Sequence, residues 1–303
     1  MDRLTAMTAF VRCVERGSFS AVAREMNMTQ PTVSKLVAAL EKRLAGKLFA
    51  RSARRLALTA EGHHFYERCR TIIDAVDNAE ASFKTGREEI AGILRVATSV
   101  GFGRTQVMSR MRAFMRRYPL LRIDLLLNDR FVDLVEEGVD VAFRIGELKE
   151  SGLIARRIGT TFRVTAGAAA YFRLNGEPST PEDLSAHNCI LYTGLATAND
   201  WPYSRGGRDR SVRVAGNFQS NSSEAVRAAT LSGIGVALSP IWLFGDDIRA
   251  KRLKVVLTDY QPKPLPIHAV SPANRRYSAK VNAFVEFFKT EFDRDPFVSG
   301  YRG

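Results

Sequence analysis

The segment 15–35 carries polar side chains in a pattern that predicts two short helices joined by a tight polar turn. Ser18 or Ser20 can cap the first helix, and Thr29 is the expected N-cap of the second. Pro31 fits the first turn of the second helix, where its missing N–H costs nothing. The side of this helix that faces away from its apolar positions carries Gln30, Thr32, Ser34 and Lys35. Such side chains can bind base edges and phosphates, so the pattern predicts a DNA-reading helix-turn-helix; a helical hairpin with a solvated polar face is the alternative.

A basic turn follows the second helix. Two short strands are predicted at Leu48-Phe49 and at 56–58, and the turn between them carries Arg51, Arg54 and Arg55. Beside a recognition helix, such a hairpin is a wing that lays arginines along phosphates or into the minor groove. A solvated hairpin tip would tolerate the same arginines. A further amphipathic helix over residues 4–15 supplies enough apolar surface to close a three-helix core.

This N-terminal segment resembles the winged helix-turn-helix of LysR-type transcriptional regulators, without a gap. The residues that carry the resemblance are Phe10, Gly17 to Ala23, Gln30 to Ser34, Leu40-Glu41, Leu48 to Arg51, Arg54 and Leu58 to Gly62. The resemblance continues, more loosely, along nearly the whole chain. The resemblance implies a bacterial regulator that binds double-stranded DNA at an interrupted inverted repeat, as a homodimer or homotetramer, and responds to a small-molecule effector. RNA polymerase is a further candidate partner. The expected DNA-binding residues are Ser18, Ser20, Thr29, Gln30, Pro31, Thr32, Ser34, Lys35, Arg51, Arg54 and Arg55.

The charge of the chain agrees with an anionic partner. Its formal net charge is +13, of which residues 1–58 hold +7 (11 Lys and Arg against 4 Asp and Glu) and the other 245 residues +6. A membrane surface would also attract this charge, but no basic amphipathic helix or lipidation signal accompanies it. No apolar run reaches transmembrane length, no signal peptide is evident, and the three dispersed cysteines suit a reducing compartment. The sequence therefore predicts a cytoplasmic, nucleoid-associated protein without a membrane partner.

A long helix is predicted from 59 to 85, with an apolar residue at alternating spacings of four and three. This heptad seam consists of Phe65, Cys69, Ile72, Val76, Ala79 and Phe83. At 1.5 Å per residue the helix would be about 40 Å long, too long to be buried along one small winged domain. We therefore expect the seam to pair with a second subunit, as the linker helix of the resembled family does. The alternative is an amphipathic helix packed on its own chain.

Beyond residue 92 the pattern changes to strands alternating with helices, which favours a parallel α/β sheet. The predicted strands are 93–97, 121–127, 139–145, 158–164, 190–192, 212–214, 236–238 and 268–270; the predicted helices are 105–118, 131–137, 223–232 and 279–292. The predicted fold class is α/β: a winged helix-turn-helix domain (1–58), a linker helix (59–87) and a two-lobed effector domain (88–303) that resembles periplasmic binding proteins. Lobe I would comprise 91–163 and 267–303, and lobe II 164–266.

An effector pocket is expected where strands end between the lobes. Hydroxyl and amide groups at Thr98, Ser99 and Val100 could hold an anion or carboxylate at a helix N-terminus. Arg144, beside Ile145 and Gly146, interrupts an apolar strand and needs either an anionic ligand or an acid such as Asp140 or Glu147. Lobe II would contribute Ser220 and Asn221, which could equally be ordinary helix-capping residues. By resemblance these three places line the pocket, and the ligand is a small molecule of unknown identity, favoured to be anionic.

Catalytic interpretations have little support. Neither glycine-rich segment, 101–106 nor 233–238, has the third glycine of a dinucleotide fingerprint, and no nucleophile elbow or phosphate loop occurs. The four histidines show no metal-ligand spacing. We predict no enzyme activity, cofactor, catalytic residue or metal. An enzyme built from scattered residues would be revealed by turnover assays, and a constitutive DNA-binding protein without a ligand by ligand titration.

The two kinds of DNA contact should separate by mutation. Gln30→Ala should weaken binding to the cognate site by about 1–3 kcal/mol and relax base preference there. Arg54→Ala or Arg55→Ala should weaken cognate and random DNA alike and reduce the salt dependence, by a slope of about 0.9 for each phosphate that is no longer neutralised. Titrations of both DNAs at several salt concentrations measure this. An equal loss of specificity in both kinds of variant would contradict the assignment.

Overall fold

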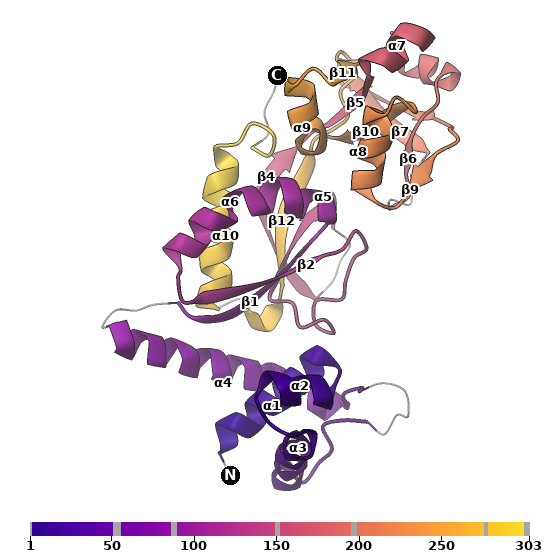
Figure 1. Cartoon of the computed structure of the whole chain (residues 1–303). Coiled ribbons are helices and arrows are strands. Elements are labelled where there is room, and N and C mark those ends of the chain that lie inside the picture. The colour runs from indigo at the N-terminus through magenta and orange to yellow at the C-terminus, as the bar shows by residue number, and fades with distance from the viewer. Residues whose placement is uncertain are drawn as a thin grey trace. The chain divides into compact units, whose positions relative to one another are not determined.

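The computed structural model describes residues 2–50, 56–85, 90–148, 152–194, 199–275 and 278–299. The chain forms two compact units: residues 1–93 with the short piece 118–122, and the remainder (Figure 1). No helix in the described ranges is long and apolar enough to cross a membrane.

The first unit is helical. Its helices are α1 (Arg3–Arg16), α2 (Phe19–Glu25), α3 (Gln30–Leu44) and α4 (Ala60–Thr85). Both expected caps are present: the Ser18 hydroxyl accepts the Ala21 N–H at 3.3 Å, and the Thr29 hydroxyl accepts the Thr32 N–H at 3.3 Å. The turn between α2 and α3 is closed by the Met28 N–H, which donates to the Ala23 carbonyl at 2.8 Å. Local polar groups therefore fix where each helix of the motif begins and ends.

The core of this unit is built around Phe10 of α1, which is fully buried. The centre of its ring lies 5.5 Å from that of Phe49 and 6.4 Å from that of Tyr66. The sequence pattern places the apolar side of α3 at Val33, Leu36, Val37, Leu40 and Leu44. The first four are buried, and Leu44, at the end of the helix, is 41% exposed. In place of two predicted strands, a single β-bridge joins Phe49 and Leu58 in the described part of this segment. The wing residues Arg51, Arg54 and Arg55 lie outside the described residues.

The heptad seam of α4 is divided between two environments. Cys69 is fully buried in the core of the same unit and Phe65 packs against that core, while burial raises the pKa of the Cys69 thiol to about 12. The expectation that Cys69 faces a partner subunit is therefore wrong, because α1 already covers this part of the helix. Further along, Ile72 and Ala79 are exposed, Val76 is half-buried and Phe83 is 91% exposed.

The second unit has two lobes. Lobe I holds a five-stranded sheet in the order β2-β1-β3-β12-β4. Its strands are β1 (Gly92–Thr98), β2 (Leu121–Leu127), β3 (Val141–Ile145), β4 (Leu153–Thr161) and β12 (Leu265–Pro272). β1 and β3 are parallel as predicted, but β12 is antiparallel to both of its neighbours, so the sheet is mixed rather than parallel. The last strand returns from lobe II to lie between β3 and β4.

Aromatic side chains hold two helices on one face of this sheet. Helix α6 (Met108–Arg117) follows α5 (Val100–Phe102) and a π-helical turn (Gly103–Val107), and α10 is Ala279–Asp293. Phe114 of α6 meets Phe284 of α10 at 5.1 Å, and Phe143 of β3 stacks on the same Phe284 ring at 5.4 Å.

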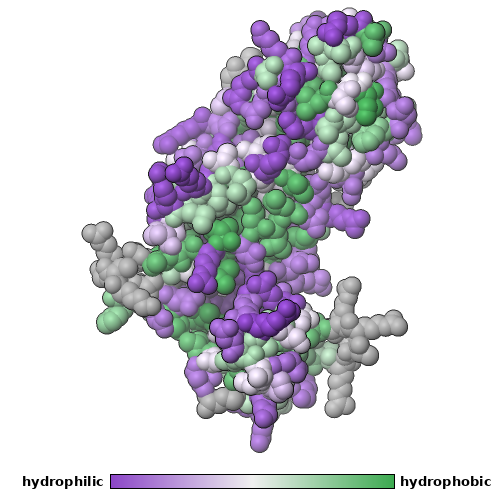
Figure 2. Space-filling model, in the orientation of Figure 1, coloured by the Kyte–Doolittle hydropathy of each residue, from purple (hydrophilic) through white to green (hydrophobic). Residues whose placement is uncertain are grey.

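The other face of the sheet is covered by the segment between β2 and β3, which the sequence predicted as a helix over 131–137. It forms turns over 134–138 instead: the Asp133 carboxylate accepts the Val135 and Glu136 N–H groups at 2.8 and 3.2 Å, as a helix cap does, but Gly138, at a left-handed φ of 63°, ends the segment after about one turn. Leu134 is buried against the sheet, whereas Phe131 is exposed. Figure 2 shows a hydrophobic area over this part of lobe I.

Lobe II is built on the antiparallel sheet β10-β5-β11. Its elements are β5 (Arg163–Ala168), α7 (Ala169–Asn175), a 3-10 helix (Pro181–Ala186), β6 (Leu191–Tyr192), β7 (Asp200–Arg205), β8 (Arg208–Arg213), β9 (Gln219–Ser220), α8 (Ser223–Leu231), β10 (Val236–Pro240), α9 (Ile241–Arg249) and β11 (Leu253–Val256). The strand expected at 158–164 is in fact the end of β4 and the start of β5, with Phe162 between them at the crossing of the lobes. The sequence pattern did not reveal α7 and α9.

The seam of α4 generates a stability test. Ile72→Asp with Val76→Asp should split the predicted dimer and leave the winged unit folded, because neither side chain is fully buried. Cys69→Asp should instead unfold that unit, since a carboxylate at a fully buried position costs several kcal/mol. Sedimentation and thermal unfolding separate the two outcomes. If the double variant sedimented as wild type, dimerisation would lie elsewhere.

Candidate DNA-binding and effector sites

The candidate DNA-reading surface is the outward side of α3. Gln30, Thr32 and Lys35 are exposed there, and Ser34 is half-exposed. The Gln30 amide donates to the Ser34 hydroxyl one turn along at 3.0 Å, which holds the amide close to the helix surface. Ser20 is exposed on α2, whereas the Ser18 hydroxyl is engaged as a helix cap.

The four acids of residues 1–58 do not neutralise that surface. Asp2 caps α1, and Glu15 and Glu25 pair with Arg12 at the α1–α2 contact. Glu41 pairs with Lys47 at 2.6 Å and accepts the Leu48 N–H at 2.9 Å, where it anchors the base of the wing segment. All four carboxylates among residues 1–58 are thus bound within the unit, and the positive field beside α3 persists.

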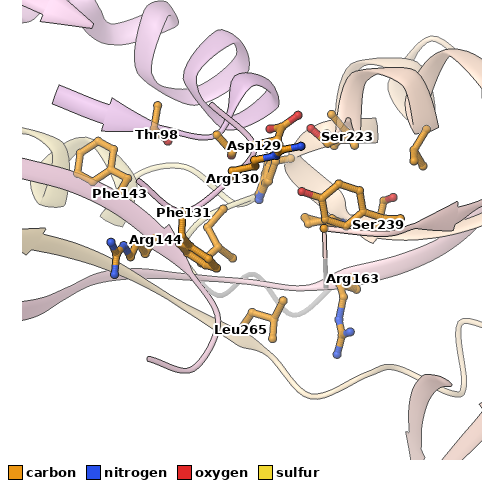
Figure 3. Close-up of a pocket in the computed structure, with 18 of the residues that line it drawn as sticks. Thr98, Asp129, Arg130, Phe131, Phe143, Arg144, Arg163, Ser223, Ser239 and Leu265 are labelled. Atoms are coloured by element: carbon orange, nitrogen blue, oxygen red, sulfur yellow. The ribbon is translucent and has the colours of Figure 1, made fainter. Parts of the chain in front are cut away.

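The candidate effector site is a cavity of about 200 Å³ within the second unit. Lobe I contributes the ends of β1 and β3 and the segment after β2; lobe II contributes β5, β6, β7, α8, β10 and α9 (Figure 3). Aromatic side chains form much of its wall, from Phe131, Phe143, Tyr192, Trp201 and Trp242. Both tryptophans of the chain therefore line this one cavity.

Half of the predicted effector residues line the cavity. Thr98, Ser99, Arg144 and Ile145 do so; Val100, Gly146, Ser220 and Asn221 do not. In lobe II the polar residues before α8 bond to groups of their own segment. The Ser220 hydroxyl accepts the Ser222 N–H at 3.1 Å, and Ser222 caps the helix. Asn221 is exposed, and Ser223 is the residue of this run that reaches the cavity.

The N-terminus of α5, the helix that follows β1, already lies beside a carboxylate of the chain. The Val100 N–H, expected to bind an anion, donates to the Asp129 carboxylate at 3.0 Å. Burial raises the pKa of the Tyr192 hydroxyl, and the nearby Asp129 raises it further. The prediction of an anionic ligand rested partly on the Val100 N–H, and that N–H is already bonded to the Asp129 carboxylate of the same chain.

Arg144 has neither of the predicted acidic partners. Its guanidinium donates to the Val132 carbonyl at 3.2 Å and lies 5.1 Å from the centre of the Phe131 ring. Asp140 instead pairs with the buried Arg275, at 3.2 Å. Burial lowers the pKa of Arg144, and Asp133 opposes the shift.

Several lining residues were missed from the sequence. Four buried polar atoms around the cavity have no hydrogen-bond partner within the described protein: Thr98 Oγ1, Arg163 Nε, Ser223 Oγ and Trp242 Nε1. Arg163 carried the same signal as Arg144, a charge beside apolar strand residues. The tryptophans carried no signal, because aromatic residues are ordinary core residues in a sequence pattern.

Comparisons with known proteins agree with this architecture. Residues 4–63 match the bacterial regulatory helix-turn-helix protein of the lysR family, and residues 87–293 match the LysR substrate binding domain. An HTH-type transcriptional regulator of Haemophilus influenzae is 33% identical over 281 residues, covering 93% of this chain and 98% of its own. DmlR, an HTH-type transcriptional regulator of Escherichia coli, is 33% identical over 290 residues, covering 95% and 94%.

Solved structures of full-length regulators are also similar to this chain. The full chain is similar to CrgA, a LysR-type transcriptional regulator from Neisseria meningitidis, with a TM-score of 0.63 and 28% identity over 95% of this chain and 98% of that one. AphB of Vibrio cholerae, a virulence activator, gives a TM-score of 0.59 and 26% identity over 95% and 98%.

The chain belongs to the LysR family of transcriptional regulators. It is not an enzyme: it combines a DNA-binding helix-turn-helix with an α/β effector-binding domain, in a family whose members bind DNA and small molecules and form oligomers.

The unpartnered hydroxyl of Thr98 generates a stability test. Thr98→Val should stabilise the ligand-free protein by about 1 kcal/mol, because it removes a buried polar atom that lacks a hydrogen bond. Thr165→Val is the matched control: Thr165 is equally buried, but its hydroxyl bonds the Tyr203 hydroxyl at 2.8 Å, so this change should destabilise. Denaturant unfolding measures both. A loss of stability in Thr98→Val would show that its hydroxyl already has a structural role.

Proposed function

We propose that this protein regulates transcription by binding an interrupted inverted repeat as a homodimer or homotetramer, under the control of a small molecule held in the cavity of lobes I and II. The observation that carries the proposal is the cavity itself. Its unpartnered donors come from both lobes, Thr98 from lobe I and Ser223 and Trp242 from lobe II. A ligand that bonds both sets favours one lobe arrangement over others, which is the requirement for a population shift.

In this proposal, Gln30, Ser34 and Lys35 of α3 read base edges in the major groove. The wing arginines Arg51, Arg54 and Arg55 contact the backbone. The exposed side of α3 supports this assignment, as does the engagement of all four carboxylates of residues 1–58 in a helix cap or an ion pair within the unit.

The exposed half of the seam, formed by Ile72, Val76, Ala79 and Phe83, joins two subunits. One winged domain contacts too few phosphates for tight specific binding, whereas a dimer makes the second half-site contact intramolecular. Phe83, an almost fully exposed aromatic residue on α4, supports a partner at this place. We place the protein in the cytoplasm on the nucleoid, where RNA polymerase is a candidate further partner.

The test separates DNA binding from the response. Genome-wide mapping supplies the operator and, from the neighbouring genes, candidate effectors for a promoter-reporter assay. Thr98→Val with Ser223→Ala should keep operator affinity and raise the effector concentration for half response by about tenfold or more, since two hydrogen bonds to the effector are removed. Gln30→Ala should do the reverse, weakening operator binding alone.

The matched control is Ser220→Ala with Asn221→Ala, a pair of polar residues of lobe II outside the cavity. It should respond as wild type does. A wild-type dose response in the Thr98 and Ser223 variant would remove the cavity from the mechanism. A promoter that responds to no candidate would favour a constitutive regulator.

A further inference from the structure

We propose that the cavity selects small aromatic carboxylates, and that Arg163 is the residue that pairs with the carboxylate. This inference rests on the proposed function, since it names the ligand class of the same cavity. It differs from the sequence-based expectation, which assigned the charge to Arg144 and to the amides before α5.

Arg163 is a cation without a counter-charge among the described residues. It is the first residue of β5, where it pairs with Pro240 of β10, and it is one of the residues that line the cavity. Its Nε atom is buried and has no hydrogen-bond partner, and no ion pair joins Arg163 to any acid in the described part of the chain. A partly buried guanidinium of this kind gains most from an anion that enters the cavity.

The other charges of the lining are already engaged or exposed. Arg144 bonds the Val132 carbonyl and lies over the Phe131 ring. Arg130 and Asp200, which also line the cavity, are exposed. Asp129 accepts the Val100 N–H, so its charge is partly compensated. In Figure 3 the Arg163 side chain points away from Asp129 and Ser223, so a carboxylate paired with it would lie apart from that acid.

The walls suit an aromatic ring. Tyr192 and Trp201 from lobe II and Phe131 from lobe I offer flat apolar surfaces, and Phe131 is 70% exposed, as a wall awaiting a ligand would be. The size also fits, because an apolar cavity of about 150 Å³ accommodates benzene and this one measures about 200 Å³. Trp242 Nε1 can only donate, so it favours an oxygen acceptor on the ligand.

Tryptophan fluorescence of the full-length protein tests the proposal, because both tryptophans line the cavity and the signal has no other source. The probes are benzoate and three compounds that each lack one of its features. Benzamide lacks the charge, cyclohexanecarboxylate lacks the aromaticity, and acetate lacks the ring. Wild type should bind benzoate about tenfold or more tightly than benzamide, the difference expected for one charge-assisted hydrogen bond. Cyclohexanecarboxylate and acetate should bind progressively more weakly.

Arg163→Gln should remove the preference for benzoate over benzamide, and Arg163→Lys should restore part of it. Arg208→Gln, an exposed arginine of the β7–β8 hairpin, removes the same charge outside the cavity and should keep the preference. Thermal unfolding and operator binding of each variant report whether it is folded. Arg144→Gln distinguishes the two arginines of the cavity.

Three results would overturn the proposal: equal binding of benzoate and benzamide to wild type, a preference that survives in folded Arg163→Gln, or one that disappears in Arg144→Gln. Absence of any fluorescence change with all four probes at millimolar concentration would also reject this ligand class. None of these results touches the proposed regulatory function, which fails on a different measurement, the dose response of the promoter in the cavity variants.

Discussion

The cavity depends on the way the chain crosses between the lobes. One crossing is a single residue, Phe162, between the last residue of β4 and the first of β5, and its carbonyl accepts the Ile241 N–H of α9 at 2.8 Å. The return crossing lies between β11 and β12. Because the outward crossing is so short, strand and helix ends of both lobes are held around one space. The same crossing places Arg163 at the cavity.

Stability and function oppose each other around this space. Buried donors without protein partners each cost about 1–3 kcal/mol in the ligand-free protein, and four such atoms of the described residues surround the cavity. A chain selected for stability alone would replace them by apolar groups of the same shape. Their retention is expected where a ligand supplies the missing acceptors, since functional sites are the places where local rules are broken. The cavity is thus preorganised for polar contacts by groups that destabilise it when empty.

The features that were predicted correctly from the sequence depend on residues close to one another in the chain. Ser18 and Thr29 cap their helices as expected because a cap involves residues three apart, and the strand 121–127 was placed correctly from its apolar run. One error arises where distant segments compete, because α1 buries Cys69, which the heptad assigned to a partner. Another arises from length, because Gly138 ends the segment after Asp133 before a helix can extend beyond one turn. Likewise, Ser220 and Asn221 could not be told from Ser223, because which residue of a polar run faces a cavity depends on the facing lobe.

The position of β12 has a consequence for synthesis on the ribosome. In the finished lobe I sheet, β3 and β4 are neighbours only through β12, and roughly 100 residues separate β4 from β12 along the chain. At translation rates of about 5–20 residues per second, both strands wait about 5–20 s for their shared partner. During that interval their open edges can pair with other nascent chains. Lobe II, by contrast, has its sheet strands complete by Val256 and can fold first, so a nascent chain of this regulator would acquire its second lobe before its first.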